Sequence, residues 1–139
     1  MIAGPTASGK SDLAVQLAKR VDGEIISVDS RQCYRQINIG TAKPTDRQIN
    51  EVPHHNISNL DLDEEDSAMA FHQRAIDWTG KIEERGRTVI FCGGSTLHLQ
   101  SLIRPLDDMP SSSDENIKQL QKTSYNSRID TIKKKLKKV

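Results

Sequence analysis

The chain has 139 residues, a formal charge of +1, and 35% hydrophobic but only 4% aromatic residues. This length is typical of one domain, and no apolar run approaches the ~20 residues that a membrane-spanning helix needs. Its two cysteines, Cys33 and Cys92, are far apart in the sequence. These features exclude membrane, collagen-like and disulfide-rich secreted classes, so we expect a cytoplasmic protein with two unpaired, buried thiols and no membrane partner. We also expect a monomer.

The first thirty residues alternate between apolar runs and a periodic segment. Met1–Ala3 predicts a short strand, and Glu24–Val28, which is rich in β-branched residues, predicts a second. Between them an apolar residue recurs every four positions, which predicts an amphipathic helix that ends at Gly23. The apolar face of that helix consists of Leu13, Leu17 and Val21, with Ala14 and Ala18 beside them.

The next sixty residues continue this alternation. Ile37–Pro44 predicts a loop, Pro53–Ile57 a short strand or turn, and the acid-rich segment Asp61–Asp66 an exposed loop. Ser67 is placed to cap a helix that ends near Gly86. The core-facing stripe of this helix consists of Phe71, Ala75, Trp78 and Ile82.

Thr88–Cys92 is continuously apolar, as in strands that are buried on both faces of a parallel sheet. A turn at Gly93–Thr96 and a helix over Leu97–Ile103 follow it. The order of elements predicts an α/β fold in which three parallel strands are flanked by helices. Because three strands are few for such a sheet, we expect the chain to be a fragment of a longer protein.

A change of composition marks the C-terminal part. We expect an incomplete α/β core over residues 1–105, a linker over 106–113, and a polar helical segment over 114–139. Residues 118–139 hold eight basic side chains and one acid, so this segment carries +7 and the rest of the chain −6. Such a charge can contact a polyanion, but a solvated helix face explains it equally well.

A glycine-rich turn precedes the first predicted helix and fits the pattern GxxxxGK[ST] without a mismatch. Its glycines let successive N–H groups point at an anion, and the helix that begins at Lys10 adds the positive end of its dipole. Lys10 adds a full charge, and the Ser11 hydroxyl can bind Mg²⁺. The motif predicts a P-loop NTPase-like fold and a di- or triphosphate site formed by Gly4, Pro5, Thr6, Ala7, Ser8, Gly9, Lys10 and Ser11.

Two other strand ends belong at the same edge of the sheet. Asp29 follows the second strand, where a carboxylate can bind metal or accept a proton; a helix N-cap is the alternative. Gly93–Thr96 follows the third strand, and its hydroxyls and N–H groups can contact the same ligand or form a plain turn. No carboxylate ends that third strand, unlike in a typical P-loop ATPase or kinase.

The adjacent histidines His54 and His55 invite a metal interpretation. Neighbouring side chains point in different directions, however, and no acid or cysteine stands at ligand spacing from them. We therefore favour structural, hydrogen-bonding roles for both rings.

Four segments together resemble the tRNA dimethylallyltransferase (isopentenyl transferase) family: Gly4–Ser11, Ile25–Tyr34, Ile39–Pro44 and Val52–His55. The resemblance is close over residues 1–105 and weak over 106–139. Members of this family transfer the dimethylallyl group of dimethylallyl diphosphate to N6 of the adenine next to the tRNA anticodon. The resemblance therefore implies Mg²⁺ as cofactor, and dimethylallyl diphosphate and tRNA as partners.

The resemblance also implies roles for single residues. Lys10 would neutralise the leaving diphosphate, Ser11 would assist Mg²⁺, and Asp29 would accept the proton of the adenine amine. Ser95 keeps the hydroxyl of the family's threonine and would share in catalysis. The residues that contact tRNA would be Asp29, Ser30, Arg31, Gln32 and Ser95. The basic segment 114–139 would begin a helical insertion that reaches over the tRNA.

The chain departs from the family at Thr96 and His98, where the family usually has glycine and tyrosine. Three other functions stay open: prenylation of free adenine nucleotides, a P-loop small-molecule kinase, and an inactive truncated remnant. The missing acid after the third strand and the segment Asp29–Tyr34 argue against the kinase. Alone, the 139 residues are expected to be marginally stable and inactive.

Overall fold

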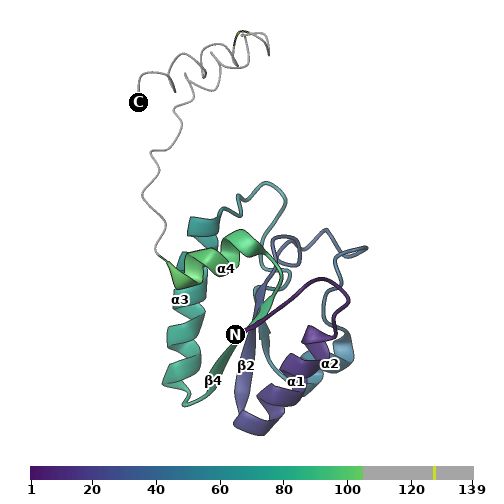
Figure 1. Ribbon diagram of the computed structural model, residues 1–139, viewed down its shortest axis with the longest axis vertical. Helices are drawn as coiled ribbons and strands as arrows, with labels where there is room; N and C mark the ends of the chain where they lie inside the picture. The colour runs from purple at the N-terminus through teal and green to yellow at the C-terminus, as the bar shows by residue number, and fades with distance from the viewer. Residues whose placement is uncertain (105–126, 128–139) are drawn as a thin grey trace. The chain divides into compact units, whose positions relative to one another are not determined.

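The computed structural model of the chain describes residues 1–104 and Ser127 (Figure 1). The chain divides into two units, Met1–Leu106 and Asp107–Val139, and every element named below lies in the first. The predicted linker over 106–113 and the basic helix over 114–139 lie outside the described residues, apart from Ser127. Within the described part, no helix is both long and apolar enough to cross a membrane.

Four parallel strands form one sheet in the order β1-β4-β2-β3. They are β1 (Ile2–Ala3), β2 (Gly23–Val28), β3 (His54–His55) and β4 (Thr88–Gly93). The expected number of three strands is therefore wrong. The additional strand is β3, at the segment for which the sequence left a short strand or turn open, and it pairs with the middle of β2.

Helices cover both faces of this sheet (Figure 1). On one side lie α1 (Lys10–Val21) and α2 (Asp46–Glu51), and on the other α3 (Ala68–Glu84) and α4 (Thr96–Ile103). Ser67 caps α3 as predicted, because its hydroxyl accepts a hydrogen bond from the Ala70 N–H. Helix α2 was not predicted, although Thr45 and Gln48 form a capping box, which marks a helix start in the sequence.

The buried side of α1 differs from the predicted one. The helix residues buried against β2 and β4 are Ala14, Val15 and Ala18. The exposed residues are those of the predicted stripe, Leu13, Leu17 and Val21, with exposed fractions of 55%, 38% and 40%. The prediction was right for Ala14 and Ala18 and wrong for the three large apolar side chains, because small side chains let the helix pack closely on the sheet.

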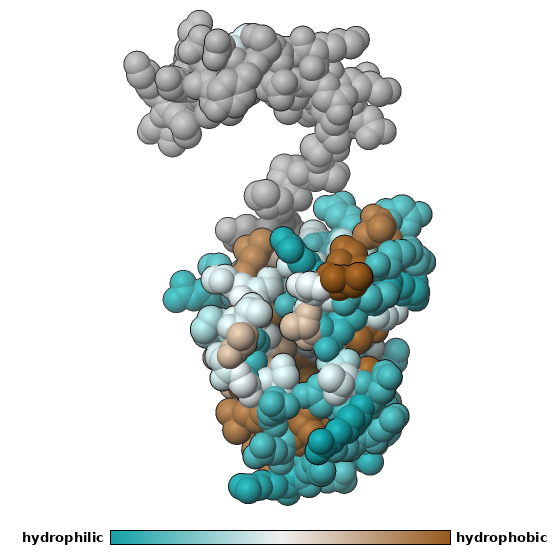
Figure 2. All heavy atoms as spheres, turned by 90° about the vertical axis from the view of Figure 1, so that its right-hand side faces the viewer, coloured by the Kyte–Doolittle hydropathy of each residue, from teal (hydrophilic) through white to brown (hydrophobic). Residues whose placement is uncertain are grey.

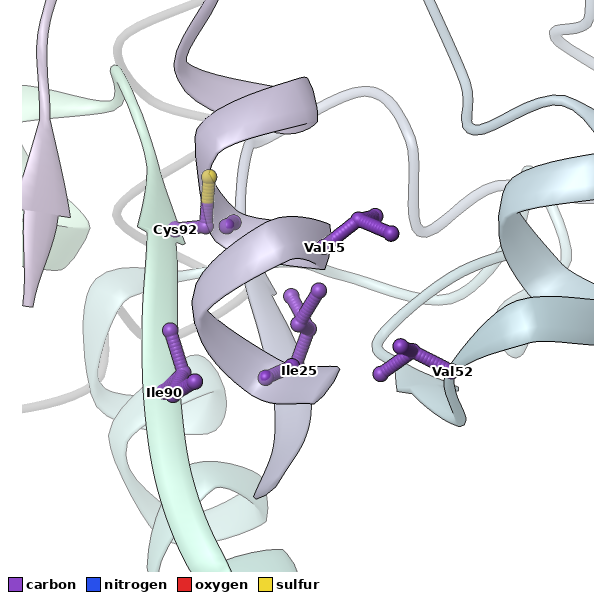
Figure 3. Packing of buried hydrophobic residues seen from close by; sticks show 7 residues of the cluster. Val15, Ile25, Val52, Ile90 and Cys92 are labelled. Atoms are coloured by element: carbon purple, nitrogen blue, oxygen red, sulfur yellow. The ribbon is translucent and has the colours of Figure 1, made fainter. Parts of the chain in front are cut away.

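Two apolar clusters lie on opposite faces of the sheet. Toward α1, alternate residues of the central strands, Ile25, Ile90 and Cys92, pack with Val15 and Val52 (Figure 3). Toward α3, the cluster consists of Val28, Phe71 and Ala75, with Phe91, Leu99 and Leu102 packed against it. This alternation follows from the two-residue period of a strand.

The burial of β4 and α3 matches the sequence patterns only in part. Ile90 and Cys92 are buried as expected, but Thr88 is exposed and Val89 and Phe91 are half-buried, so the prediction of burial on both faces was too broad. Val89 and Phe91 alternate with Ile90 and Cys92 and therefore lie on the α3 face, which the described helices cover incompletely, whereas Thr88 is the first residue of the strand. In the α3 stripe, three residues are buried and Trp78 is half-buried.

The acid-rich segment is exposed, as predicted, except at its end. Leu62–Glu65 is exposed, whereas the Asp66 side chain is 2% exposed and is bonded to the Arg74 guanidinium of α3. The Cys33 thiol also donates to Asp66, over 3.4 Å. The prediction was wrong for Asp66 because a buried carboxylate is tolerated where a cation from another element neutralises it.

Candidate functional site

The carboxyl ends of β1, β2 and β4 lie in register. Ala3 and Val28 both pair with Gly93, which is the last residue of β4. A Cβ atom on Gly93 would lie 2.0 Å from the Val28 carbonyl oxygen, so glycine alone fits this close approach of two strands. Three loops therefore leave the sheet next to one another, and they begin at Gly4, Asp29 and Gly94.

These loops surround a pocket of about 690 Å³. Every site residue predicted from the sequence lines this pocket: Gly4–Ser11, Asp29–Gln32 and Ser95. The pocket is also lined by residues that were not predicted as site residues: Ser27, Gln48 and the segment Gly40–Ala42. A signal for the last of these existed, because Gly40–Ala42 lies within one of the segments that carry the family resemblance.

The loop before α1 has the backbone of an anion site. Ala7 and Gly9 have positive φ angles of 63° and 79°, while the intervening Ser8 does not, an alternation that turns successive N–H groups inward. Gly9 caps α1 without a side-chain hydrogen bond, so the first N–H groups of the helix have no intrahelical acceptor. The Lys10 ammonium donates to the Pro5 carbonyl over 2.9 Å and thus lies across the loop.

Asp29 uses only one of its two carboxylate oxygens within the described chain. Its Oδ1 accepts from the backbone N–H groups of Arg31 and Gln32, over 2.9 and 3.2 Å. These bonds close a turn rather than cap a helix, since no helix follows Asp29, and the N-cap alternative is therefore wrong. Oδ2 makes no hydrogen bond to another described residue, which leaves a basic oxygen at the pocket.

The strand end at β4 offers a hydroxyl but not its backbone donors. The N–H groups of Gly94 and Ser95 both donate to the Val28 carbonyl over 3.1 Å, so these two donors are already engaged within the protein. Ser95 precedes α4, yet its hydroxyl makes no capping hydrogen bond. The Ser95 hydroxyl is therefore the group that this loop presents to the pocket.

The two departures from the family pattern, Thr96 and His98, are both accommodated at the start of α4. Thr96 is exposed at the start of α4. His98 is buried and stacks on Phe71, with ring centroids 4.5 Å apart and planes at 10°. Burial lowers the pKa of His98, although the Asp66 carboxylate, 3.7 Å from Nε2, opposes that shift. A neutral ring therefore fills a core position against Phe71 of α3.

The paired histidines make the hydrogen bonds expected of structural residues. His54 Nδ1 lies 2.7 Å from the Val52 carbonyl oxygen, and His55 Nε2 lies 2.6 Å from a Glu24 carboxylate oxygen. Burial lowers the pKa of His54, in keeping with a neutral ring. No group of three or more metal-ligating side chains occurs within residues 1–104. Cys33 and Cys92 are both buried free thiols, as predicted.

Comparison with known proteins agrees with this geometry. Residues 32–139 match the model of the IPP transferase family. The chain is 46% identical over 115 residues to a tRNA dimethylallyltransferase of Chlorobaculum parvum, an alignment that covers 83% of this chain and 37% of that protein. This chain thus spans little more than a third of that relative's length.

Two solved structures have the same fold. The full-length tRNA isopentenylpyrophosphate transferase of Bacillus halodurans superposes with a TM-score of 0.74 at 36% identity, over 99% of this chain and 46% of that one. A eukaryotic dimethylallyltransferase acting on tRNA gives a TM-score of 0.77 at 31% identity, over 96% and 34% of the two chains. Since the family model matches most of its residues, the chain belongs to the IPP transferase family.

Proposed function

We propose that the whole protein transfers the dimethylallyl group of dimethylallyl diphosphate to N6 of an adenine beside the tRNA anticodon. The observation that carries this proposal is the meeting of the glycine-rich loop, Asp29 and Ser95 in one pocket. An anion site, a basic oxygen and a hydroxyl are what this reaction requires side by side. The relatives named above support the choice of a transferase over a kinase.

The glycine-rich loop would hold the diphosphate. The N–H groups around Ala7 and Gly9 and the first turn of α1 would bind its oxygens. Lys10 would leave the Pro5 carbonyl and pair with the anion, which stabilises the charge that grows on the leaving group. Binding would thus replace a hydrogen bond to a neutral carbonyl by an ion pair with the diphosphate.

Asp29 would act as the general base. The bond between C1 of the dimethylallyl group and the diphosphate oxygen breaks, and its electron pair leaves with the diphosphate. The lone pair of the adenine amine forms the new bond from N6 to C1, and the N6 proton passes to Oδ2 of Asp29. Because Oδ1 is held by two backbone N–H groups, the carboxylate is oriented before the substrate arrives.

Mg²⁺ would be held by the hydroxyl of Ser11, together with diphosphate oxygens and water. Ser11 lines the same pocket as Asp29, and oxygen donors suit Mg²⁺, which usually keeps several waters beside one or two protein ligands. When bound, the ion would neutralise charge on the diphosphate.

The acceptor RNA would approach over Ser30 and Arg31, which are both exposed at the rim, beside Asp29 and Ser95. The Arg31 guanidinium makes no ion pair with a described residue and suits a phosphate. An adenine must leave its stack to reach a pocket of this kind, as in other base-modifying enzymes.

The test is transfer of labelled dimethylallyl from its diphosphate to unmodified tRNA by the whole protein. We expect label in the RNA, on N6 of an adenine beside the anticodon. Label on adenosine monophosphate with none on tRNA would replace the proposal by adenine-nucleotide prenylation. Transfer of the ATP γ-phosphate to a small acceptor, without prenyl transfer, would favour the kinase. If no reaction is seen in any of these assays, the remaining interpretation is that the protein is an inactive remnant.

A further inference from the structure

Every polar group of Gln32 is already engaged inside the protein. Its side-chain nitrogen donates to the carbonyl oxygens of Thr41 and Ala42, over 3.0 and 2.9 Å. Its side-chain oxygen accepts from the Ser27 hydroxyl over 2.8 Å. Both amide hydrogens are therefore used, and only one weaker acceptor position of the side chain is left for a ligand.

The backbone of Gln32 is held in the same way. Its N–H donates to Oδ1 of Asp29, and its carbonyl accepts from the Ser58 N–H over 2.9 Å. One residue thus ties together strand β2, the turn that carries Asp29, and the segment that follows β3.

The segment that Gln32 reaches has no regular structure of its own. Residues 37–44 contain no helix or strand, and none of the backbone N–H groups of residues 37–43 donates to a backbone carbonyl of a described residue. Gly40, Thr41 and Ala42 nevertheless line the pocket. Lys43 anchors the far end of the segment, since its ammonium donates to Tyr34, Asn38 and Ser58.

We propose that Gln32 is a positioning residue, which fixes the Gly40–Ala42 wall of the pocket and the Asp29 turn, rather than a residue that contacts the RNA. The role requires a primary amide, because the side chain must donate twice and accept once. A carboxylate would face two carbonyl oxygens without a proton to offer, and a thioether would make none of the three bonds. Only the predicted effect on activity rests on the proposed function; the predicted effect on the segment does not.

The direct test measures the motion of the segment in the absence of RNA. Ile39 is 97% exposed, so an Ile39→Cys nitroxide label in the whole protein reports on the segment without disturbing packing. Cys33 and Cys92 are buried and are shielded from the reagent. With Gln32 present we expect an ordered spectrum, and with Gln32→Glu or Gln32→Met a rotational correlation time several-fold shorter.

Gln36→Glu is the matched control. It makes the same change of charge four residues away on an exposed side chain, whose only hydrogen bond within the described residues is to Asp61, and we expect it to leave the spectrum unchanged. In the transfer assay, kcat should fall by up to about 100-fold for both Gln32 variants, the cost of a misplaced catalytic group.

Two results would overturn the assignment. One is a label at position 39 that is already mobile when Gln32 is present. The other is an unchanged spectrum in both Gln32 variants combined with a loss of tRNA affinity, which would make Gln32 an RNA contact. If the wild-type protein transfers no prenyl group but the spectra change as expected, the proposed function fails and the positioning role stands.

Discussion

Strand β2 carries a carboxylate near each end, and the two are treated differently. Glu24, near the amino end, is 2% exposed and is bonded through both oxygens to Arg85, and also to Arg87 and His55. Asp29, just beyond the carboxyl end, is half-buried and leaves one oxygen without a described partner. A fully bonded carboxylate holds elements together, whereas a partly bonded one is available for chemistry.

The same contrast extends to the surroundings of each residue. Around Glu24, β2 is joined to β3 by His55 and to the turn before β4 by the two arginines. Around Asp29 lie exposed hydroxyls and a loop with positive φ angles at Ala7 and Gly9. The site is therefore built at one end of the sheet, and the ion pairs of Glu24 lie at the other.

Figure 2 shows the α1 side of the molecule, where brown apolar side chains are scattered among teal polar ones.

The sharpest test of this contrast is Asp29→Asn in the whole protein. Asparagine keeps the oxygen that accepts from Arg31 and Gln32, so the melting temperature should not change, whereas kcat should fall by roughly 10²–10⁴-fold. Steady-state kinetics at several Mg²⁺ concentrations, with melting curves for both proteins, check this. Recovery of the rate at high Mg²⁺ would assign Asp29 to metal binding, and an unchanged kcat would remove it from the mechanism.

Gly93→Ala should reduce both stability and activity, unlike Asp29→Asn, which should reduce activity alone. The new Cβ would push apart the ends of β2 and β4, so we expect a loss above about 3 kcal/mol in the free energy of unfolding, together with lost activity. Gly80→Ala in α3 is the control, because its Cβ would contact nothing within 4 Å; there we expect a gain of up to about 1 kcal/mol. Equal stabilities of the two variants in urea would contradict the close approach of the strands.

Glu24→Gln should have the opposite effect to Asp29→Asn: a loss of stability with little change in kcat. Burial raises the pKa of Glu24, but hydrogen bonds and charges from Arg85 and His55 outweigh it and lower the pKa from 4.5 to about 2. That difference corresponds to roughly 3 kcal/mol of stability at neutral pH. Urea unfolding should show this loss while the kcat of the folded protein stays near normal. Glu51→Gln, at an exposed carboxylate also paired with two cations, should change stability far less.

The contribution of Glu24 should also depend on pH. Its pKa is lower in the folded chain, so its stabilisation is complete well above the unfolded value of 4.5 and is lost as the pH falls from there toward about 2. Unfolding curves of wild type and Glu24→Gln should therefore converge between about pH 5 and pH 2. A constant gap across this range would mean that Glu24 stabilises the fold through packing rather than through its charge.

The sequence predicted the site better than the packing around it. The glycine-rich loop, Asp29 and Ser95 were predictable because parallel strands place their carboxyl ends at one edge, whatever the details of the core. The wall at Gly40–Ala42 was not, because a segment without helix or strand is positioned by side-chain bonds from Gln32 and Lys43. Such bonds join residues far apart in sequence and leave no periodic pattern.

Two wrong predictions about the fold also arise from contacts between residues that are far apart in the sequence. In α1 the periodic stripe of large residues is exposed, because the short distance between helix and sheet favours Ala14 and Ala18 at the interface. The periodicity of a single sequence does not reveal how closely a helix packs on its sheet. Asp66 belongs to an acidic run, and only the position of Arg74 on α3 makes its burial tolerable. The helix α2 is different: its capping box from Thr45 to Gln48 was readable and was overlooked.

The most direct test of the central claim, that the loop before α1 holds the diphosphate, is calorimetric titration of pyrophosphate into the whole protein. Loss of a charge-assisted hydrogen bond is worth roughly 1.5–3 kcal/mol, so Lys10→Ala should bind about 10- to 100-fold more weakly than wild type. Lys19→Ala, on the exposed side of the same helix and paired with Glu51, should bind as wild type does. Equal affinities of wild type and Lys10→Ala would contradict the claim.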